Sequence, residues 1–391
     1  MSAVALPPAT DALDALNNHC VACHSGRGSA PFRFDSLDGI LRSRLLMRAL
    51  IEDGTMPPSL VAKSGYPIAH DRALDDSTKQ VLLRALATPT EAREAFAQVS
   101  QCDAPEICDE RLRFSPTAAW IMPASGGMRL RTYLIDLPHD SPARVRGFQA
   151  TSPRAFGASP IRVIACAPDP ERSLAILSAP NENGVESMGN VGRTPSGALG
   201  MITRVAPSFT LPEGFSFDLP KGSLTMETTS EAIGKCAEVS SELAWIESRD
   251  ADTRVVRALA MTPRRLRIPS GDTLLTADTL TVARDLDLVG VLVKGGAFLR
   301  SIRLESSKRA SDTRVLFSIP DFRLALSEPW FFETPVAIDR DERITATFGF
   351  DNTSANPQQP HDPPHAVVAG LPPEGEDSVL ILLVADRTLS R

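Results

Sequence analysis

The segment Leu286–Val293 has the sequence LDLVGVLV, and the segment Val379–Val384, close to the C-terminus, has the sequence VLILLV. Short apolar runs of this kind, rich in β-branched residues and bounded by turn residues, are typical of buried β-strands. These two segments therefore predict strands in the C-terminal half of the chain.

Similar runs of five to eight residues recur from residue 130 onward, separated by Gly, Pro, Asn and Asp. Strands at this regular spacing predict β-sandwiches or jelly rolls. The roughly 290 residues beyond position 100 exceed one ordinary sandwich, so we expect two, divided near residue 275. The other expected strands are Leu130–Leu137, Ile161–Cys166, Leu224–Thr229, Leu243–Glu247, Arg254–Met261, Phe298–Leu304, Arg314–Phe317 and Arg343–Phe348.

The first hundred residues have a different pattern, with apolar residues at helical spacing and capping residues at the expected helix starts. We therefore expect this part of the chain to be helical. The expected helices are residues 9–23, capped by Thr10 or Asp11; a helix from Asp35 or Ser36 to Gly54; a helix that begins at Ser77 and ends by Pro89; and a stretch over residues 90–99.

The composition excludes some classes of function. The chain of 391 residues has a net charge of −7, with 41 Lys and Arg against 48 Asp and Glu. Nucleic-acid-binding proteins normally present a basic surface, so we expect no nucleic-acid partner. No window approaches the roughly 18 consecutive apolar residues of a transmembrane helix, so we expect no membrane span. The 32 prolines and the few aromatic residues favour turns and strands over a helical bundle.

The segment Cys20–His24, with the sequence CVACH, has the spacing of a c-type haem attachment site. In such a site two thiols bond to the two haem vinyl groups, and the histidine that follows is the proximal ligand of the iron. The alternatives are a coincidental cysteine pair or a redox CxxC. We predict one covalent haem c attached to Cys20 and Cys23, with His24 as an iron ligand.

Met56 is the expected sixth ligand of the iron. It lies in the segment TMPP at residues 55–58, and two prolines restrict the backbone enough to hold a thioether in place. Methionine opposite histidine raises the haem potential and suits electron transfer. The alternative for Met56 is a place in the apolar core. His19 and His70 are the rival ligands, and His70 would give a bis-histidine haem of lower potential.

The other four cysteines are compatible with disulfides. Cys102 and Cys108 would close a short loop, and Cys166 and Cys236 either pair between strands or stay free. Haem attachment and disulfides both belong outside the cytosol, so we expect a periplasmic or secreted protein. The first 20 residues, however, lack the basic start and apolar stretch of a signal peptide.

Two parts of the chain resemble known families. Residues 20–58 resemble the small cytochrome c module at the front of some bacterial monooxygenase-like proteins, through Cys20–His24, Ala30–Phe32 and Met56–Pro58. The rest resembles the copper type II, ascorbate-dependent monooxygenases, the family of peptidylglycine α-hydroxylating and dopamine β-monooxygenases. The matching segments are Leu211–Gly214, Leu219–Ser223, Ile268–Gly271 and, most specifically, Phe350–Pro357 followed by Pro363 and Pro364.

These resemblances cover most of residues 12–385 and imply a multidomain fold class. A small all-α cytochrome c-like haem domain over residues 1–100 is expected to precede two all-β jelly-roll (β-sandwich) domains. The two monooxygenase-like domains would cover residues 101–275 and 276–391.

The resemblance implies two copper sites, one with three histidines and one with a His-x-His pair and a methionine, because copper takes imidazole and thioether ligands. The matching positions lack these ligands, and residues 140–360 contain no histidine. We therefore expect no copper. His361 and His365 can share a metal only if their loop is helical. The four segments at the expected ligand positions are Phe156–Pro160, Met226–Ser230, Lys294–Gly296 and Asp377–Val379.

Two functions follow. In the first, a monohaem c-type cytochrome with a copper-less, non-hydroxylating monooxygenase-like scaffold transfers single electrons. It would serve a redox partner protein, for example an intact copper monooxygenase homologue. In the second, Met56 does not hold the iron, and the haem itself is a peroxidase-type or oxygenase-type centre with substrate on the β domains. A third alternative is a binding protein in which the haem only stabilises the N-terminal part.

Overall fold

The structure, a computed structural model, describes most of the chain. The described chain forms two compact units. One comprises residues 1–59 and 70–106, and the other comprises residues 60–69 and 107–391. The described residues are 9–21, 23–24, 32–58, 60–69, 72–99, 113–114, 120–125, 127–138, 143–150, 160–167, 184–186, 197–203, 205–232, 234, 236–239, 242–248, 253–309 and 311–387.

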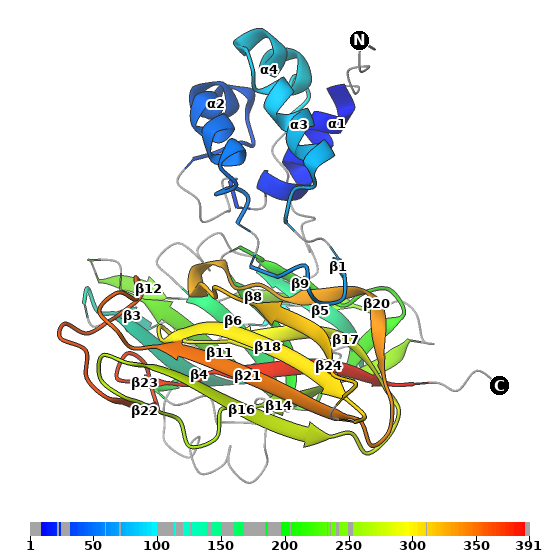
Figure 1. Ribbon diagram of the computed structural model, residues 1–391, viewed down its shortest axis with the longest axis vertical. Coiled ribbons are helices and arrows are strands. Elements are labelled where there is room, and N and C mark those ends of the chain that lie inside the picture. Colours follow the sequence, from blue (N-terminus) through cyan, green and yellow to red (C-terminus); the bar gives the residue numbers. More distant parts are fainter. Residues whose placement is uncertain are drawn as a thin grey trace. The chain divides into compact units, whose positions relative to one another are not determined.

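The larger unit is built from β-sheets (Figure 1). Its largest sheet has ten strands, in the order β1 (Ile68–Ala69), β20 (Trp330–Ile338), β17 (Leu286–Lys294), β24 (Val379–Asp386), β14 (Arg254–Met261), β10 (Phe215–Asp218), β5 (Arg144–Ala150), β13 (Leu243–Glu247) and β2 (Arg113–Phe114), with β9 (Ser208–Thr210) paired to β5.

Two further large sheets belong to the same unit. A five-stranded sheet has the order β7 (Val185–Glu186), β4 (Met128–Asp136), β11 (Ser223–Glu231), β6 (Pro160–Cys166) and β8 (Ala198–Thr203). A four-stranded sheet has the order β16 (Thr273–Thr281), β21 (Arg343–Asp351), β18 (Leu299–Ser307) and β19 (Arg314–Ile319). The unit also has two small sheets. One contains β15 (Arg267–Ile268), β22 (Val367–Ala369) and β23 (Gly375–Glu376). In the other, β12 (Ala237–Val239) pairs with β3 (Trp120–Met122).

The central strands β17 and β24 are buried on both faces. Ile381 and Leu383 pack into one apolar core with residues of β4, β6 and β11, whereas Leu380 and Leu382 pack into a second core with residues of β18, β19 and β21. Successive strand residues point to opposite faces, so a strand between two cores must be apolar at every position. This is why Val379–Val384 does not alternate with polar residues.

The smaller unit contains the helices α1 (Ala9–Leu16), α2 (Leu37–Glu52), α3 (Asp76–Ala85) and α4 (Pro89–Ala95), with a π-helical turn at Asn17–Val21. The predicted cap Ser36 is confirmed, since its side chain accepts a hydrogen bond from the Gly39 N–H. The cap of α3 is Asp75 and not Ser77, which donates its own hydroxyl to Asp75. The apolar faces of these helices share a third small core that includes Leu16, Ile40 and Phe96.

The expected fold class is wrong. The described chain is mostly β-sheet with four short α-helices, and a separate small all-α cytochrome c domain is not seen. Residues 60–69, between α2 and α3, belong to the β unit, where β1 joins the edge of the ten-stranded sheet. The helical unit is therefore not continuous in sequence, because a piece of the β unit is inserted between α2 and α3. The layered sheets are of the sandwich type, but the two apolar cores share the strands β17 and β24.

Cys166 is buried and Cys236 is exposed, and neither is in a disulfide. Of the two alternatives for this pair, the structure therefore does not support a disulfide between strands. Cys102 and Cys108 lie outside the described residues. None of the helices in the described ranges has the length and apolar character needed to cross a membrane.

Candidate functional site

The cysteine and histidine residues of the CVACH segment come together where the π-helical turn ends. The amide N–H groups of Cys23 and His24 both donate to the carbonyl of Cys20, at 3.2 and 3.0 Å. This turn presents the two thiols and the imidazole from one short piece of backbone. Neither cysteine is in a disulfide, and both are partly buried.

The ring of His24 is held by two contacts. Its Nδ1 lies 2.9 Å from the carbonyl oxygen of Phe32, and its face stacks on Phe34 with ring centroids 4.1 Å apart. A carbonyl only accepts hydrogen bonds, so Nδ1 carries the proton and Nε2 keeps its lone pair. Burial lowers the pKa of His24, which favours the neutral ring. A neutral imidazole with Nδ1 bonded to a carbonyl is the form that ligates metals through Nε2.

The two thiols have different surroundings. Burial raises the pKa of Cys20 to about 12, with a further contribution from Cys23. The Arg72 guanidinium donates to the Cys23 sulfur at 3.0 Å. The Cys20 thiol is therefore protonated at neutral pH.

The candidate sixth ligands lie elsewhere in the same unit. Met56 follows the end of α2, is half-buried, and donates its backbone N–H to the Leu50 carbonyl at 2.9 Å. Among the described residues, no hydrogen bond or ring contact joins the Met56 side chain to His24. The Nδ1 of His19 lies 3.2 Å from the carbonyl of Arg72. His70 lies outside the described residues.

The residues at the cysteine segment fit a c-type haem, because one turn presents two thiols that are not in disulfides and a histidine whose Nδ1, and not its Nε2, is bonded to the Phe32 carbonyl. The covalent tether would come from Cys20 and Cys23, and the axial nitrogen from His24. Met56 remains a predicted ligand.

Three of the four segments at which the resemblance implies copper ligands come together in the β unit. Glu227 on β11, Lys294 at the end of β17 and Asp377 just before β24 form one buried ionic cluster. The Lys294 Nζ lies 2.6 Å from Oε1 of Glu227 and 2.8 Å from Oδ2 of Asp377. The side chains of Lys294 and Glu227 are each only 2% exposed. The fourth segment, Phe156–Pro160, lies outside the described residues except for Pro160.

The charges in this ionic cluster compensate one another. Burial alone would lower the pKa of Lys294, but Asp377 and Glu227 outweigh this effect and raise it, so the ammonium stays charged. Burial raises the pKa of Glu227, although Lys294 pulls it down. The buried Arg162 adds a second cation close by, donating to the Gly295 carbonyl at 3.0 Å and to Thr229 Oγ1 at 3.1 Å.

A second buried carboxylate, Glu376, is satisfied by neutral donors. It accepts from the N–H groups of Gly296 and Phe298, at 2.7 and 3.1 Å, and from the Ser378 hydroxyl at 2.6 Å. Burial raises the pKa of Glu376 to about 7. A Cβ at Gly296 would lie 2.5 Å from this carboxylate, so only glycine allows the close approach.

The ionic cluster does not fit copper. Copper takes imidazole, thiolate or thioether donors, whereas an ammonium group has no lone pair to donate and repels a cation. Lys294 and the nearby Arg162 already supply two positive charges against the two carboxylates. No chemistry through copper therefore follows at these positions.

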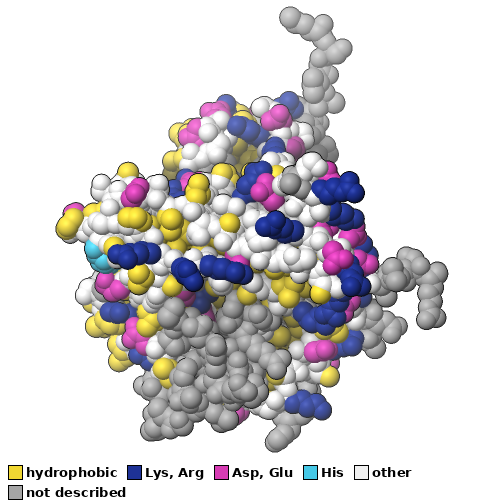
Figure 2. All heavy atoms as spheres, turned by 60° about the horizontal axis from the view of Figure 1, so that its bottom comes forward, with side chains coloured by type: hydrophobic (Ala, Val, Ile, Leu, Met, Phe, Trp, Pro, Cys, Tyr) yellow, Lys and Arg dark blue, Asp and Glu magenta, His cyan; other side chains and the backbone are white. Residues whose placement is uncertain are grey.

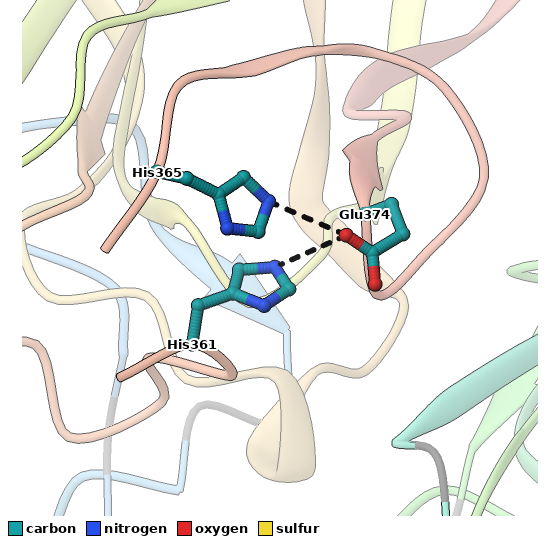
Figure 3. Close-up of side chains that lie close together, drawn as sticks. All are labelled: His361, His365 and Glu374. Atoms are coloured by element: carbon teal, nitrogen blue, oxygen red, sulfur yellow. Dashed lines mark ion pairs between the residues drawn. The ribbon is translucent and has the colours of Figure 1, made fainter. Parts of the chain in front are cut away.

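A cluster of two histidines and one glutamate in the β unit was not expected from the sequence. His361, His365 and Glu374 converge at the loops around β22 and β23, as Figure 3 shows. The two imidazole rings lie 3.9 Å apart at their centroids and are tilted by 43°. Glu374 Oε2 lies 3.3 Å from Nε2 of His365 and 4.0 Å from Nε2 of His361. The expectation that a helix is required to bring the two histidines together is wrong, since the loop does so without one.

The signal for this cluster is weak in the sequence. Both histidines lie among prolines, and the glutamate follows in Pro373–Gly375, the same Pro-Glu-Gly tripeptide found at Pro212–Gly214. Only the return of the chain through β22 and β23 places the glutamate beside the histidines.

Comparisons with known proteins add little. No family model matches the chain, and no curated protein matches it. Among solved structures, the chain is similar to the major capsid protein P2 from bacteriophage PM2, with 9% identity and a TM-score of 0.24, over 71% of this chain and 98% of that one. It is also similar to a structure of infectious bursal disease virus, Gx strain, with 11% identity and a TM-score of 0.18, over 73% of this chain and 74% of that one. Likenesses this weak carry no argument about fold or function.

Proposed function

We propose that this chain carries one covalent haem c at Cys20, Cys23 and His24 and transfers single electrons, with a β unit that does not hydroxylate through copper. The observation that carries the proposal is the hydrogen bond between His24 Nδ1 and the Phe32 carbonyl, at 2.9 Å. It fixes the tautomer and orientation that an axial imidazole needs.

Different residues of the chain would tether the haem, ligate its iron and set the charge around it. Cys20 and Cys23 would tether the porphyrin, and the ring of His24, stacked on Phe34, would hold its axial nitrogen in one orientation. The haem supplies the one-electron couple, and a Met56 thioether opposite His24 would raise its potential. Arg72, which already donates to the Cys23 sulfur, places a positive charge next to the tether.

The copper-less part of the proposal rests on the ionic cluster. Lys294 occupies a position at which the resemblance to copper monooxygenases implies a ligand, and two carboxylates compensate its charge. A scaffold of this kind would bind and orient a redox partner protein, for example an intact copper monooxygenase homologue. Covalent haem attachment would require the periplasm or another compartment outside the cytosol, so the proposal includes a periplasmic or secreted location.

The experiment is maturation of the full chain with an export signal in a host that attaches c-type haem. We expect the purified protein to keep one haem per chain after denaturation, seen as a mass increase of one haem and a haemochrome spectrum. Replacement of Cys20 and Cys23 by Ser should abolish the covalent haem. Cys236→Ser, at an exposed free thiol outside the segment, is the matched control and should leave haem content unchanged.

The sixth ligand is tested on the same protein. Met56→Ala should remove the methionine-to-iron charge-transfer band and open the iron to added ligands, while His19→Ala should leave the band in place. A chain that carries no covalent haem after export would overturn the proposal. Loss of the band in His19→Ala but not in Met56→Ala would reassign the ligand.

A further inference from the structure

We propose that His361, His365 and Glu374 form a binding site for a divalent first-row transition metal such as Zn²⁺, in the β unit. The proposal is independent of the haem, because it rests on three other side chains. Two imidazoles and one carboxylate are a donor set that proteins use for zinc, with a fourth position left for water or another ligand.

The distances between the donor atoms suit a single metal ion. Ligands about 2.0–2.1 Å from a tetrahedral zinc lie about 3.3 Å from one another. The separation of Glu374 Oε2 from His365 Nε2 is 3.3 Å, and its separation from His361 Nε2 is 4.0 Å. The three donor atoms all lie within 4.8 Å of one another. A shift of the exposed Glu374 side chain by less than about 1 Å would bring its Oε2 to the same separation from His361 Nε2.

The loop that carries the histidines is held in place by buried amides. Asn352, which is fully buried, donates its Nδ2 to the carbonyls of His365 and Pro269, at 2.7 and 2.8 Å. The Gln359 amide in turn donates to the Asn352 oxygen at 2.9 Å. A rigid support is what makes a metal site tight, because the ligands then lose little freedom on binding.

The same loop carries the segment Phe350–Pro357, whose sequence is FDNTSANP. Its second asparagine, Asn356, donates to the carbonyls of Ala297 and Asp351, at 3.0 and 2.8 Å. The most specific motif of the β unit therefore serves to fix the backbone that presents the two histidines.

The histidines differ in their surroundings. The side chain of His361 is 12% exposed, stacks near Phe298, and has its Nε2 3.1 Å from the Pro373 carbonyl. The side chain of His365 is 48% exposed. The contact to Pro373 requires a proton on the His361 Nε2, so metal binding moves that proton to Nδ1 and exchanges the carbonyl contact for the metal bond.

A small hollow next to the site leaves room for a further ligand. It has a volume of about 360 Å³, and Arg129, His361 and Glu374 line it together with Gly127, Pro360 and Pro373. Figure 2 shows histidine atoms at the surface on one side of the molecule, with basic side chains beside them. Because the side chains of His365 and Glu374 are exposed, a metal bound there would be accessible to solvent, and Arg129 would favour water or a small anion as its further ligand.

The test is a zinc titration of the untagged full chain, with metal content measured after gel filtration. We expect one Zn²⁺ per chain, and a zinc X-ray absorption spectrum with nitrogen and oxygen neighbours and no sulfur. His365→Gln and Glu374→Gln should each weaken binding by about tenfold or more. Both residues are exposed, so these variants should fold.

The matched control is Glu213→Gln, an exposed glutamate in the other Pro-Glu-Gly tripeptide. Its zinc affinity should equal that of the unmodified chain. Three results would overturn the proposal. The first is no binding at micromolar zinc, the second is unchanged affinity in Glu374→Gln, and the third is a zinc spectrum dominated by sulfur, which would place the ion on the free thiols.

Discussion

The ionic cluster of Glu227, Lys294 and Asp377 and the histidine cluster of His361, His365 and Glu374 belong to the same unit but differ in what they leave open. In the ionic cluster every charge has an opposite charge within 2.8 Å, and the side chains are almost completely buried. In the histidine cluster the one carboxylate is 73% exposed and lies beside two imidazole rings, each of which can bind a metal once a ring nitrogen is free of its proton. The charges of the ionic cluster are already paired with one another, whereas the side chains of the histidine cluster can still bind a cation.

The two clusters are connected by a short piece of chain. Glu374 points to the histidines, while Glu376 and Asp377 are buried, the first against Gly296 and Phe298 and the second against Lys294. Acidic residues that are close in sequence thus differ in burial and in partner, because the chain runs from the surface into the interior through β23 and the start of β24. This contrast leads to four predictions, in decreasing order of expected effect.

Lys294→Met should have the largest effect. It leaves Glu227 and Asp377 buried without their cation, and removal of one partner of a buried ion pair costs about 3–5 kcal/mol. Urea unfolding followed by circular dichroism measures the change in the free energy of unfolding. The control is the double variant Glu227→Gln and Lys294→Met, which removes one charge of each sign, keeps Asp377 to balance the buried Arg162, and should recover about half of the loss or more. A loss below about 1 kcal/mol in the single variant would show that the cluster is hydrated.

Zinc should stabilise the chain through the histidine cluster alone. At a free zinc concentration 100 times the dissociation constant, binding to the folded state adds about 2.7 kcal/mol to the free energy of unfolding. The melting temperature should therefore rise by a few degrees, and the variant His361→Gln, His365→Gln should show no rise. An equal rise in both proteins would mean that zinc binds elsewhere, for example at the free thiols.

Asn352→Ala should affect both stability and zinc binding. It leaves the carbonyls of Pro269 and His365 without their donor, at a cost of about 2 kcal/mol. Asn356→Ala is the comparison, since this asparagine is equally buried but bonds to the carbonyls of Ala297 and Asp351. We expect similar losses of stability in the two variants and a weaker zinc affinity mainly in Asn352→Ala. Equal zinc affinities would show that Asn352 does not position His365.

Glu374→Gln should have the smallest effect on stability in the absence of metal. An exposed carboxylate beside two imidazoles contributes little, so the free energy of unfolding should change by less than about 0.5 kcal/mol. Chemical denaturation in the presence of a chelator measures this change. A large destabilisation would indicate that Glu374 is a structural residue, like Glu376, and would remove the contrast between the two clusters.

Ten strands were predictable, because each depends on a local pattern. All ten expected runs lie within strands of the structure to within one residue, and the aliphatic segments of β17 and β24 are at the centre of the largest sheet. The other fourteen strands of the described residues were not expected, among them the longer strands β5, β8, β16 and β20. In β16 the exposed positions include Leu275, and β20 is interrupted by Pro335, so neither has a clear two-residue period. The helix starts were predicted to within two residues at Ser36 and Ser77.

How these strands and helices pack against one another was not predictable from local sequence patterns. The short segment at residues 60–69 pairs with β20, and no local pattern marks it as part of a sheet. The buried salt bridges of Lys294 join three strands that are distant in sequence. The sequence did show that the copper ligands are missing there, but not that charged residues at those positions would compensate one another.

By itself the sequence determined the strand segments, the capped helix at Ser36 and the attachment motif Cys20–His24, because each depends on residues that are neighbours along the chain. Only the tertiary structure decided that His361 and His365 meet Glu374, and that Lys294 lies between two acids. These contacts depend on how sheets and loops pack, and packing brings together side chains whose separation in sequence carries no repeating signal.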